Sequence, residues 1–192
     1  MKCRKLIGIR YINQGTIEEL RAKNPDAVIP QNLTTGRDEE GHGTHTLATA
    51  GGNFVPNVSV YGSGYGTAKG GSPKARVAAY KVCWKPNEND SCSSADILSA
   101  YDLAIHDGVD VISASLGSVA REHLKNTIAI GSFHAMMNGI VSVAAAGNSG
   151  PDDGSVENVA PWILTVGAST TDREFTSYVT LGNKMVIKVD LS

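Results

Sequence analysis

Past its midpoint the chain reads Ile140-Val-Ser-Val-Ala-Ala-Ala-Gly-Asn-Ser-Gly-Pro151. The residues from Ile140 to Ala145 are uncharged and either β-branched or small, as in a buried strand, and turn-forming residues follow them. The pattern therefore predicts a strand that ends in a turn. Similar apolar strands are expected on either side of it, at Val77–Val82, Val109–Ser113 and Ile163–Val166.

The segments between these strands have the periodicity of helices. Ala95–His106 and Glu122–Met137 each carry apolar residues on one stripe, and the stripe of the second helix is Leu124, Ile128, Gly131, Ala135 and Met136. Apolar strands that alternate with amphipathic helices are typical of a parallel sheet with helices on both faces and right-handed crossovers. The predicted fold class is therefore α/β.

The flanking segments are less regular. Leu6–Ile12 predicts a short strand, and a long polar connection follows it. His42–Ala50 is compatible with a helix, and Gly62–Gly71 predicts a loop or ribbon. From Val179 to Val189 polar and apolar residues alternate, as in a hairpin near the margin of a sheet.

The composition is that of a globular protein. The chain has 192 residues, 41% hydrophobic and 19% charged, enough for one mid-sized domain or part of a larger one. A net charge of −2, with no basic run beyond Lys2–Lys5, argues against nucleic acid as a partner. No apolar stretch approaches the ~20 residues that cross a bilayer, and Arg10 ends the first apolar run too early for a signal peptide within this chain.

The cysteines and the glycosylation sequons favour an extracellular protein. Cys83 and Cys92 are close together across a polar loop, which leaves Cys3 over. The sequons begin at Asn32, Asn57 and Asn89, in stretches that we expect to be loops. Chance occurrence remains an alternative for the sequons, because they are common in chains of this length.

Two segments carry side chains suited to catalysis. Gly41-His-Gly-Thr-His-Thr46 places His42 between glycines at the start of a helix, where a substrate can approach the ring closely. In Ala144-Ala-Ala-Gly-Asn-Ser-Gly-Pro151, Asn148 follows the carboxyl end of a buried strand, and its amide can donate to a developing oxyanion.

Each segment has a simpler interpretation. His42 and His45 can be two metal ligands, although no nearby carboxylate has the helical spacing of a zinc protease, so no metal site is predicted. Asn148 can be an ordinary turn residue that tolerates a left-handed backbone. No phosphate-loop pattern is present around Gly62, and no cofactor is predicted.

Taken together, the two motifs resemble the catalytic-histidine and oxyanion-asparagine motifs of the subtilisin family. The text between them, including Lys69–Trp84, Ala95–Leu98 and Asp107–Ser113, is similar to the plant, cucumisin-like branch. The resemblance covers most of the chain, from about Cys3 to Gly182. It implies a partial peptidase domain over residues 1–182, with 183–192 a C-terminal strand or linker remnant.

The resemblance also implies roles for individual residues. His42 matches the general base, His45 a structural histidine and Asn148 the oxyanion donor. Ser115, Leu116 and Gly117 resemble the strand edge that pairs with substrate backbone, although Ser118 departs from the usual second glycine. Ala145, Ala146 and Gly147 resemble one wall of the pocket for the substrate side chain before the cleaved bond. Cys83 and Cys92 match a local disulfide of the plant branch.

Two family motifs are absent from these 192 residues. The nucleophile motif Gly-Thr-Ser-Met-Ala does not occur, nor does the Asp-Thr/Ser-Gly motif of the triad aspartate, and Asp107-Gly-Val lacks its middle residue. We therefore expect an incomplete sheet, without the aspartate strand between the counterparts of Val77–Val82 and Val109–Ser113, and without the serine helix. We also expect no cleavage by this chain alone.

Two functions remain open. The chain can be part of a secreted serine endopeptidase of the apoplast or cell wall, acting on polypeptide. Alternatively, it can be a non-catalytic, pseudoprotease-like module that captures extended peptide by strand addition at Ser115–Gly117.

Overall fold

The computed structural model describes residues 5–85, 92–117, 122–169 and 176–190. The chain divides into two compact units, one made of residues 1–47 and 76–168, the other of 48–75 and 169–192. Helix α2 (His42–Gly51) begins in the first unit and ends in the second. Each unit is described by itself below.

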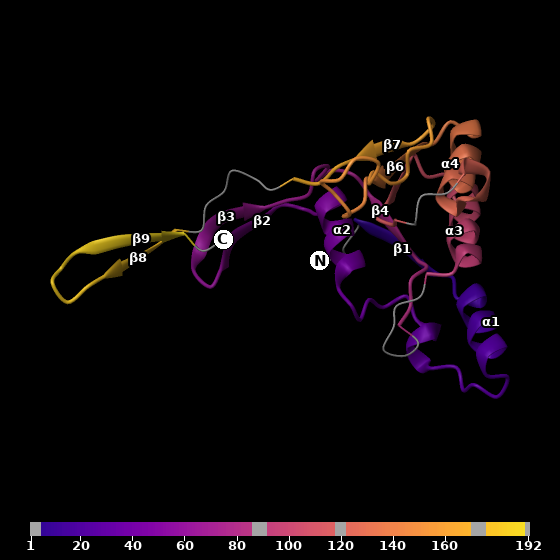
Figure 1. The fold of residues 1–192 in the computed structure, drawn as a ribbon, viewed down its shortest axis with the longest axis horizontal. Coiled ribbons are helices and arrows are strands. Elements are labelled where there is room, and N and C mark those ends of the chain that lie inside the picture. The colour runs from indigo at the N-terminus through magenta and orange to yellow at the C-terminus, as the bar shows by residue number, and fades with distance from the viewer. Residues whose placement is uncertain (1–4, 86–91, 118–121, 170–175, 191–192) are drawn as a thin grey trace. The chain divides into compact units, whose positions relative to one another are not determined.

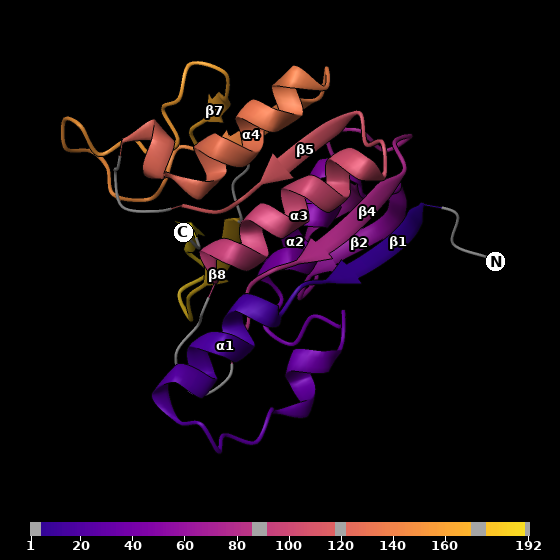
Figure 2. The ribbon, with the colours of Figure 1, turned by 90° about the vertical axis from the view of Figure 1, so that its right-hand side faces the viewer.

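The strands that the structure describes in the first unit form two parallel sheets. β1 (Leu6–Tyr11) pairs with β4 (Val77–Lys81), and the other sheet has the order β5 (Val111–Ala114), β6 (Val141–Ala145), β7 (Leu164–Val166). All of these ladders are parallel, which confirms the predicted α/β fold. Figure 2 shows β1 beside β4 and helices against the strands. Within the described residues no ladder joins β4 to β5, so each keeps one unpaired edge.

Three helices form a layer along one side of these strands. They are α1 (Gln14–Lys23), α3 (Ser94–His106) and α4 (Thr127–Met137), and they lie together in Figure 1. Tyr101 of α3 packs with Ile128 of α4 and Ala144 of β6 in a buried cluster. Gly131 permits this contact, because a Cβ there would lie 2.5 Å from the Tyr101 ring.

The other side of the β5–β6–β7 sheet stays open. Along β6 the side chains of Ser142 and Ala144 are buried, whereas Val141 is 53% exposed. Val111 of β5 and Leu164 of β7 are likewise more than half exposed. A strand directs alternate side chains to opposite faces, so the helix layer covers one set and leaves the other to solvent.

The predicted polar connection after β1 is wrong over its first part, where α1 forms. The carboxylate of Asp96, at the start of α3, accepts hydrogen bonds from the backbone N–H groups of Gly15 (2.7 Å) and Thr16 (2.9 Å) and from the Thr16 hydroxyl (2.9 Å). These bonds satisfy donors that a helix start leaves unpaired. α1 is thus fixed by a residue 80 positions away, and a 3₁₀ turn, η1 (Gln31–Thr34), follows it.

The second long helix is shorter than predicted. A separate 3₁₀ turn, η2 (His123–Lys125), precedes α4, and the Asn126 side chain caps α4 by accepting a hydrogen bond from Ala129 N–H at 3.0 Å. Leu124 therefore lies outside the helix and is 85% exposed, and Met136 is 42% exposed, so placing both on the buried stripe was wrong. Ile128, Gly131 and Ala135 are buried as expected.

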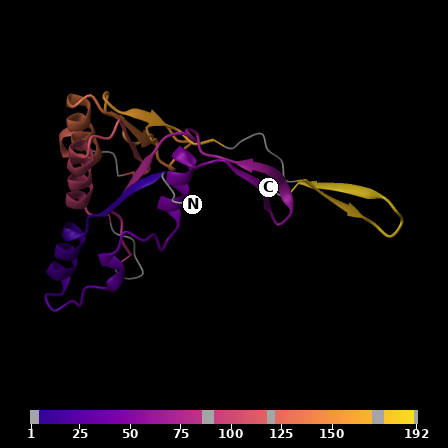
Figure 3. The same ribbon diagram turned by 180° about the vertical axis from the view of Figure 1, so that it is seen from behind.

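The described residues of the second unit form two antiparallel hairpins. β2 (Val55–Val60) pairs with β3 (Ser63–Ala68), so the glycine-rich stretch is a ribbon, and β8 (Thr176–Thr180) pairs with β9 (Val186–Asp190), as predicted. The β8–β9 hairpin is visible in Figure 3. Two sequons are not in loops, because Asn32 lies in η1 and Asn57 in β2, and Asn89 lies outside the described residues.

Candidate active site

His42 is the first residue of α2, and a carboxylate holds the loop that leads into it. One oxygen of Asp38 accepts hydrogen bonds from Glu40 N–H (3.1 Å) and Gly41 N–H (2.9 Å), while the other accepts from the backbone N–H (2.8 Å) and hydroxyl (2.6 Å) of Thr44. The Thr44 hydroxyl and the Gly41 N–H hold the pKa of Asp38 well below its usual range. Asp38 therefore acts as a charged cap of α2, beside an exposed His42.

The loop before Asp38 is tied to β4 through Lys81. The Lys81 ammonium donates to the backbone oxygens of Arg37 (2.7 Å) and Thr35 (3.3 Å) and lies 4.2 Å from the centre of the Trp84 ring. Burial lowers the pKa of Lys81. This side chain thus anchors the segment that carries the histidine motif to the β1–β4 sheet.

A second group of residues gathers at the carboxyl ends of β5 and β6. Asn158 is buried with φ +55°, and its side-chain amide donates to the backbone oxygens of Leu116 (2.9 Å) and Ala145 (2.8 Å). The Thr165 hydroxyl donates to the Asn158 backbone oxygen at 2.6 Å. Asn158 therefore bridges the segment after β5 and the end of β6, and it is itself fixed by the start of β7.

Glu157 lies in the slot between the same two segments. Its backbone N–H donates to the Ala146 oxygen at 2.9 Å. A Cβ on Gly147 would lie 2.7 Å from the Glu157 carboxyl carbon, and a Cβ on Gly117 would collide with a carboxylate oxygen. Glycine at both positions makes room for this side chain, and the backbone of Gly147 has φ +86°, a conformation that favours glycine.

The structure brings together some of the predicted site residues and not others. Ser115–Gly117 and Ala145–Gly147 form two facing walls, joined by Asn158 and separated by Glu157. Asn148 follows the second wall and is exposed. His42 belongs to the segment anchored on the β1–β4 sheet, and within the described residues no hydrogen bond joins it to Asn148.

Comparisons with known proteins show which family this chain belongs to. The model of the subtilase family matches residues 13–192. The chain is 56% identical over 187 residues to subtilisin-like protease SBT5.4 and 57% identical over 180 residues to subtilisin-like protease SBT5.3, both of Arabidopsis thaliana. The chain belongs to the subtilase family. These alignments cover 96% and 94% of the chain but only 23% and 22% of the relatives.

A solved structure has the same subtilase architecture. The S41 psychrophilic protease superposes with a TM-score of 0.51 at 26% identity, over 96% of this chain and 57% of that one. Soybean (Glycine max) subtilisin-like protease Glyma18g48580 is 52% identical over 187 residues, and this chain again spans 23% of its length. The predicted resemblance to subtilases, with plant relatives, is thus confirmed.

The disulfide implied by the plant subtilases is present. Cys83 and Cys92 are bonded across a sequence separation of 9 residues. Trp84, beside Cys83, is buried and donates its indole N–H to the Ile12 oxygen at 2.8 Å. The disulfide therefore joins the end of β4 to the residues that lead into α3.

Asp107 has a structural role in this subtilase. It caps the C-terminus of α3, where both oxygens accept hydrogen bonds from the Arg10 guanidinium at 2.7 Å and one also accepts from the Tyr80 hydroxyl at 2.8 Å. Arg10 is the main cause that lowers the pKa of Asp107 to about 2. A carboxylate engaged in this way links β1 and β4 to α3, and its described hydrogen bonds go to Arg10 and Tyr80 and not to a histidine.

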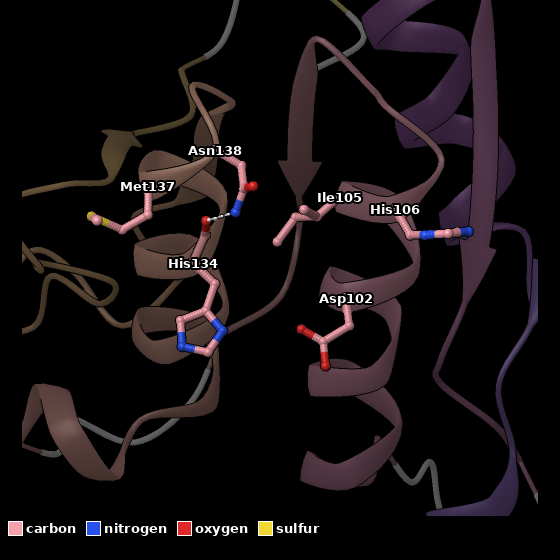
Figure 4. A pocket seen from close by; sticks show the side chains of 6 residues that line it. All are labelled: Asp102, Ile105, His106, His134, Met137 and Asn138. Atoms are coloured by element: carbon pink, nitrogen blue, oxygen red, sulfur yellow. Dashed lines mark hydrogen bonds between the residues drawn. The ribbon is translucent and has the colours of Figure 1, made fainter.

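An open hollow lies near the amino-terminal ends of β5 and β6, whereas the two walls lie at the carboxyl ends of these strands. It is lined by Asp102, Ile105, His106, His134, Met137 and Asn138. Figure 4 shows Asp102 and His134 on either side of the gap, while His106 points away from it. These residues end α3 and α4 and so precede β5 and β6, whereas the walls follow these strands. The hollow is therefore separate from the candidate cleft.

Neither a cluster of metal ligands nor a membrane-spanning helix occurs in the described part of the chain. No group of three or more His, Cys, Asp or Glu residues there could hold a metal ion. The longest helix described, α3, has 13 residues, and no described helix is long and apolar enough to cross a bilayer.

Sequence reasoning missed Asp38, Glu157 and Asn158. Asp38 had a local signal, since an aspartate shortly before a helix is a common cap. Asn158 and Glu157 had none, because their importance comes from contacts with Leu116 and Gly117, some 40 residues earlier.

Proposed function

We propose that this chain supplies the histidine, the oxyanion donor and the substrate cleft of a subtilisin-type serine endopeptidase. The observation that carries the proposal is the Asn158 bridge, which holds Ser115–Gly117 opposite Ala145–Gly147. Two backbone segments held at the carboxyl ends of parallel strands form a slot for one substrate side chain, and the segment after β5 offers an edge for substrate backbone.

The chemical roles follow from position. His42, exposed at the start of α2, accepts the proton of a serine hydroxyl and returns it to the leaving amine. Asn148, exposed beyond the cleft wall, donates its side-chain N–H to the oxyanion of the tetrahedral intermediate. Removing such a donor from subtilisin is established to cost about 10²–10³-fold in kcat.

The 192 residues contain neither the family's nucleophile motif nor its aspartate motif, so peptide capture without cleavage is expected of this chain alone. The test is to incubate it with fluorogenic peptides and with a fluorophosphonate probe, and to measure binding of labelled peptides by anisotropy. Binding without turnover or labelling supports the proposal. A serine that reacts with the probe contradicts the inactivity, and a chain that binds no extended peptide contradicts the cleft.

We further propose that the chain functions outside the cell. The Cys83–Cys92 disulfide supports this location, since such bonds persist in oxidising compartments. Asn57 is an exposed sequon in β2, whereas Asn32 is partly buried and donates to the Lys85 oxygen at 3.1 Å. Expression through a secretory pathway should therefore glycosylate Asn57 in preference to Asn32, and glycopeptide mapping reads this out.

A further inference from the structure

The Glu157 side chain occupies the slot of the candidate cleft. It lies against Gly147 of one wall and Gly117 of the other, at the two positions where a Cβ would displace it. The remaining wall residues are Ser115, Leu116, Ala145 and Ala146, which are uncharged. A carboxylate is therefore the charged group that a substrate side chain meets in this slot.

The position of this carboxylate is well fixed. The Glu157 N–H is bonded to the Ala146 oxygen, and the next residue, Asn158, is buried and bonded to Leu116, Ala145 and Thr165. Both sides of the Glu157 backbone are thus anchored to the cleft walls. A charge held by its backbone in this way can discriminate between ligands at little cost in conformational entropy.

In the part of the chain that the structure describes, no partner engages the carboxylate. Within the described residues neither an ion pair nor a side-chain hydrogen bond engages it, and the side chain is half-buried. From residue 141 to residue 168 the sequence has three acidic residues, Asp152, Asp153 and Glu157, and no lysine or arginine. A partly desolvated carboxylate in an acidic loop attracts a cationic side chain.

We propose that Glu157 makes the cleft selective for a basic residue, lysine or arginine, at the substrate position that enters the slot between Gly117 and Gly147. This inference rests on the proposed peptide cleft and specifies which side chain it prefers. The ammonium or guanidinium group pairs with the Glu157 carboxylate, while the aliphatic stem lies along the Ala145–Gly147 backbone.

The test compares peptides that differ at one residue. Fluorescein-labelled tetrapeptides ending in lysine, arginine, norleucine or glutamate are titrated with the full 192-residue chain, and anisotropy gives each dissociation constant. Norleucine matches the lysine stem without its charge. We expect lysine and arginine peptides to bind about tenfold more tightly than the norleucine peptide, with the difference shrinking as salt rises.

Three variants assign the preference to the residue. Glu157→Gln, which keeps the size of the side chain, should reduce the lysine preference to less than about twofold. Glu157→Lys should favour the glutamate peptide. Asp153→Asn removes the same charge from an exposed residue of the same loop and should leave the preference unchanged.

The outcomes separate this inference from the proposed function. Equal binding of lysine and norleucine peptides by the original chain overturns the role of Glu157 and leaves the cleft standing. The inference is also overturned if the lysine preference survives Glu157→Gln, or if Asp153→Asn abolishes that preference as fully as Glu157→Gln does. If the original chain binds none of the peptides, the cleft itself is refuted and the inference with it. Glu157→Lys provides an independent reversal test if the Gln variant does not fold.

Discussion

Replacing Asn158 should lower the free energy of unfolding through two separable effects, the loss of hydrogen bonds and strain in the backbone. The side chain donates two hydrogen bonds, to the Leu116 and Ala145 oxygens, and the backbone has φ +55°. Asn158→Gly removes the bonds and keeps the left-handed backbone accessible, whereas Asn158→Ala removes the bonds and also strains the backbone. The difference between the two variants therefore isolates the strain.

The expected magnitudes follow from these contacts. Each neutral hydrogen bond contributes about 0.5–1.5 kcal/mol to the free energy of unfolding. Part of the loss is recovered, because the buried Asn158 Oδ1 accepts no hydrogen bond within the described residues and its removal relieves that cost. We expect Asn158→Gly to lower the free energy of unfolding by about 1–2 kcal/mol, and Asn158→Ala by about 1 kcal/mol more.

Urea denaturation monitored by the fluorescence of Trp84 and Trp162, which belong to the same unit, measures both changes. Asn138→Ala is the matched control, because Asn138 is exposed and its amide donates one bond, to the His134 oxygen at 2.9 Å. That variant should change stability by less than about 0.5 kcal/mol. A glycine variant as stable as the original chain would refute the bridge, and equal stability of the Gly and Ala variants would refute the strain.

Three further predictions concern the acid response, the disulfide and the open sheet face. Because hydrogen bonds depress the pKa of Asp38, its stabilisation of α2 should be present above pH ~4 and lost as the pH falls below that value. Asp38→Asn should flatten this pH dependence of unfolding and cost about 1 kcal/mol at neutral pH; an unchanged slope would count against the cap. Non-reducing peptide mapping should find Cys83 bonded to Cys92, and Cys83→Ser should cost about 2–3 kcal/mol, whereas a free Cys83 thiol would contradict the structure. With Val111, Val141 and Leu164 more than half exposed, the isolated chain should bind hydrophobic dyes and tend to aggregate; a sharp, reversible thermal transition without dye binding would show this to be wrong.

The sequence predicted the alternating strands and helices because their signals are local. β-branched runs such as Val77–Val82 carry the strand pattern within a few residues, and the structure places β4, β5, β6 and β7 within these runs or one residue beyond them. The helix α1 had no comparable signal. Its start is stabilised by Asp96, 80 residues later, and only Thr16 and Ile17 are buried along its length.

The same distinction applies to the candidate site. His42, Asn148 and the two walls belong to short motifs that can be recognised in sequence. Glu157 and Asn158 belong to the β6–β7 loop, and their contacts depend on how that loop folds back onto Leu116 and Gly117. Neither hydrophobic period nor turn chemistry encodes such a contact, so only the structure could show it.

The contacts that secure the N-terminal segment also bear on folding during synthesis. β1 and α1 are held by partners far along the chain, namely Trp84 for Ile12, Asp96 for Thr16 and Asp107 for Arg10, at separations of 72, 80 and 97 residues. A ribosome adds about 5–20 residues each second, so this segment waits roughly 5–20 s before its last partner has been made. Until β4 has been made, Ile9 and Tyr11 have no strand to pair with, and the nascent segment is a natural client for a chaperone.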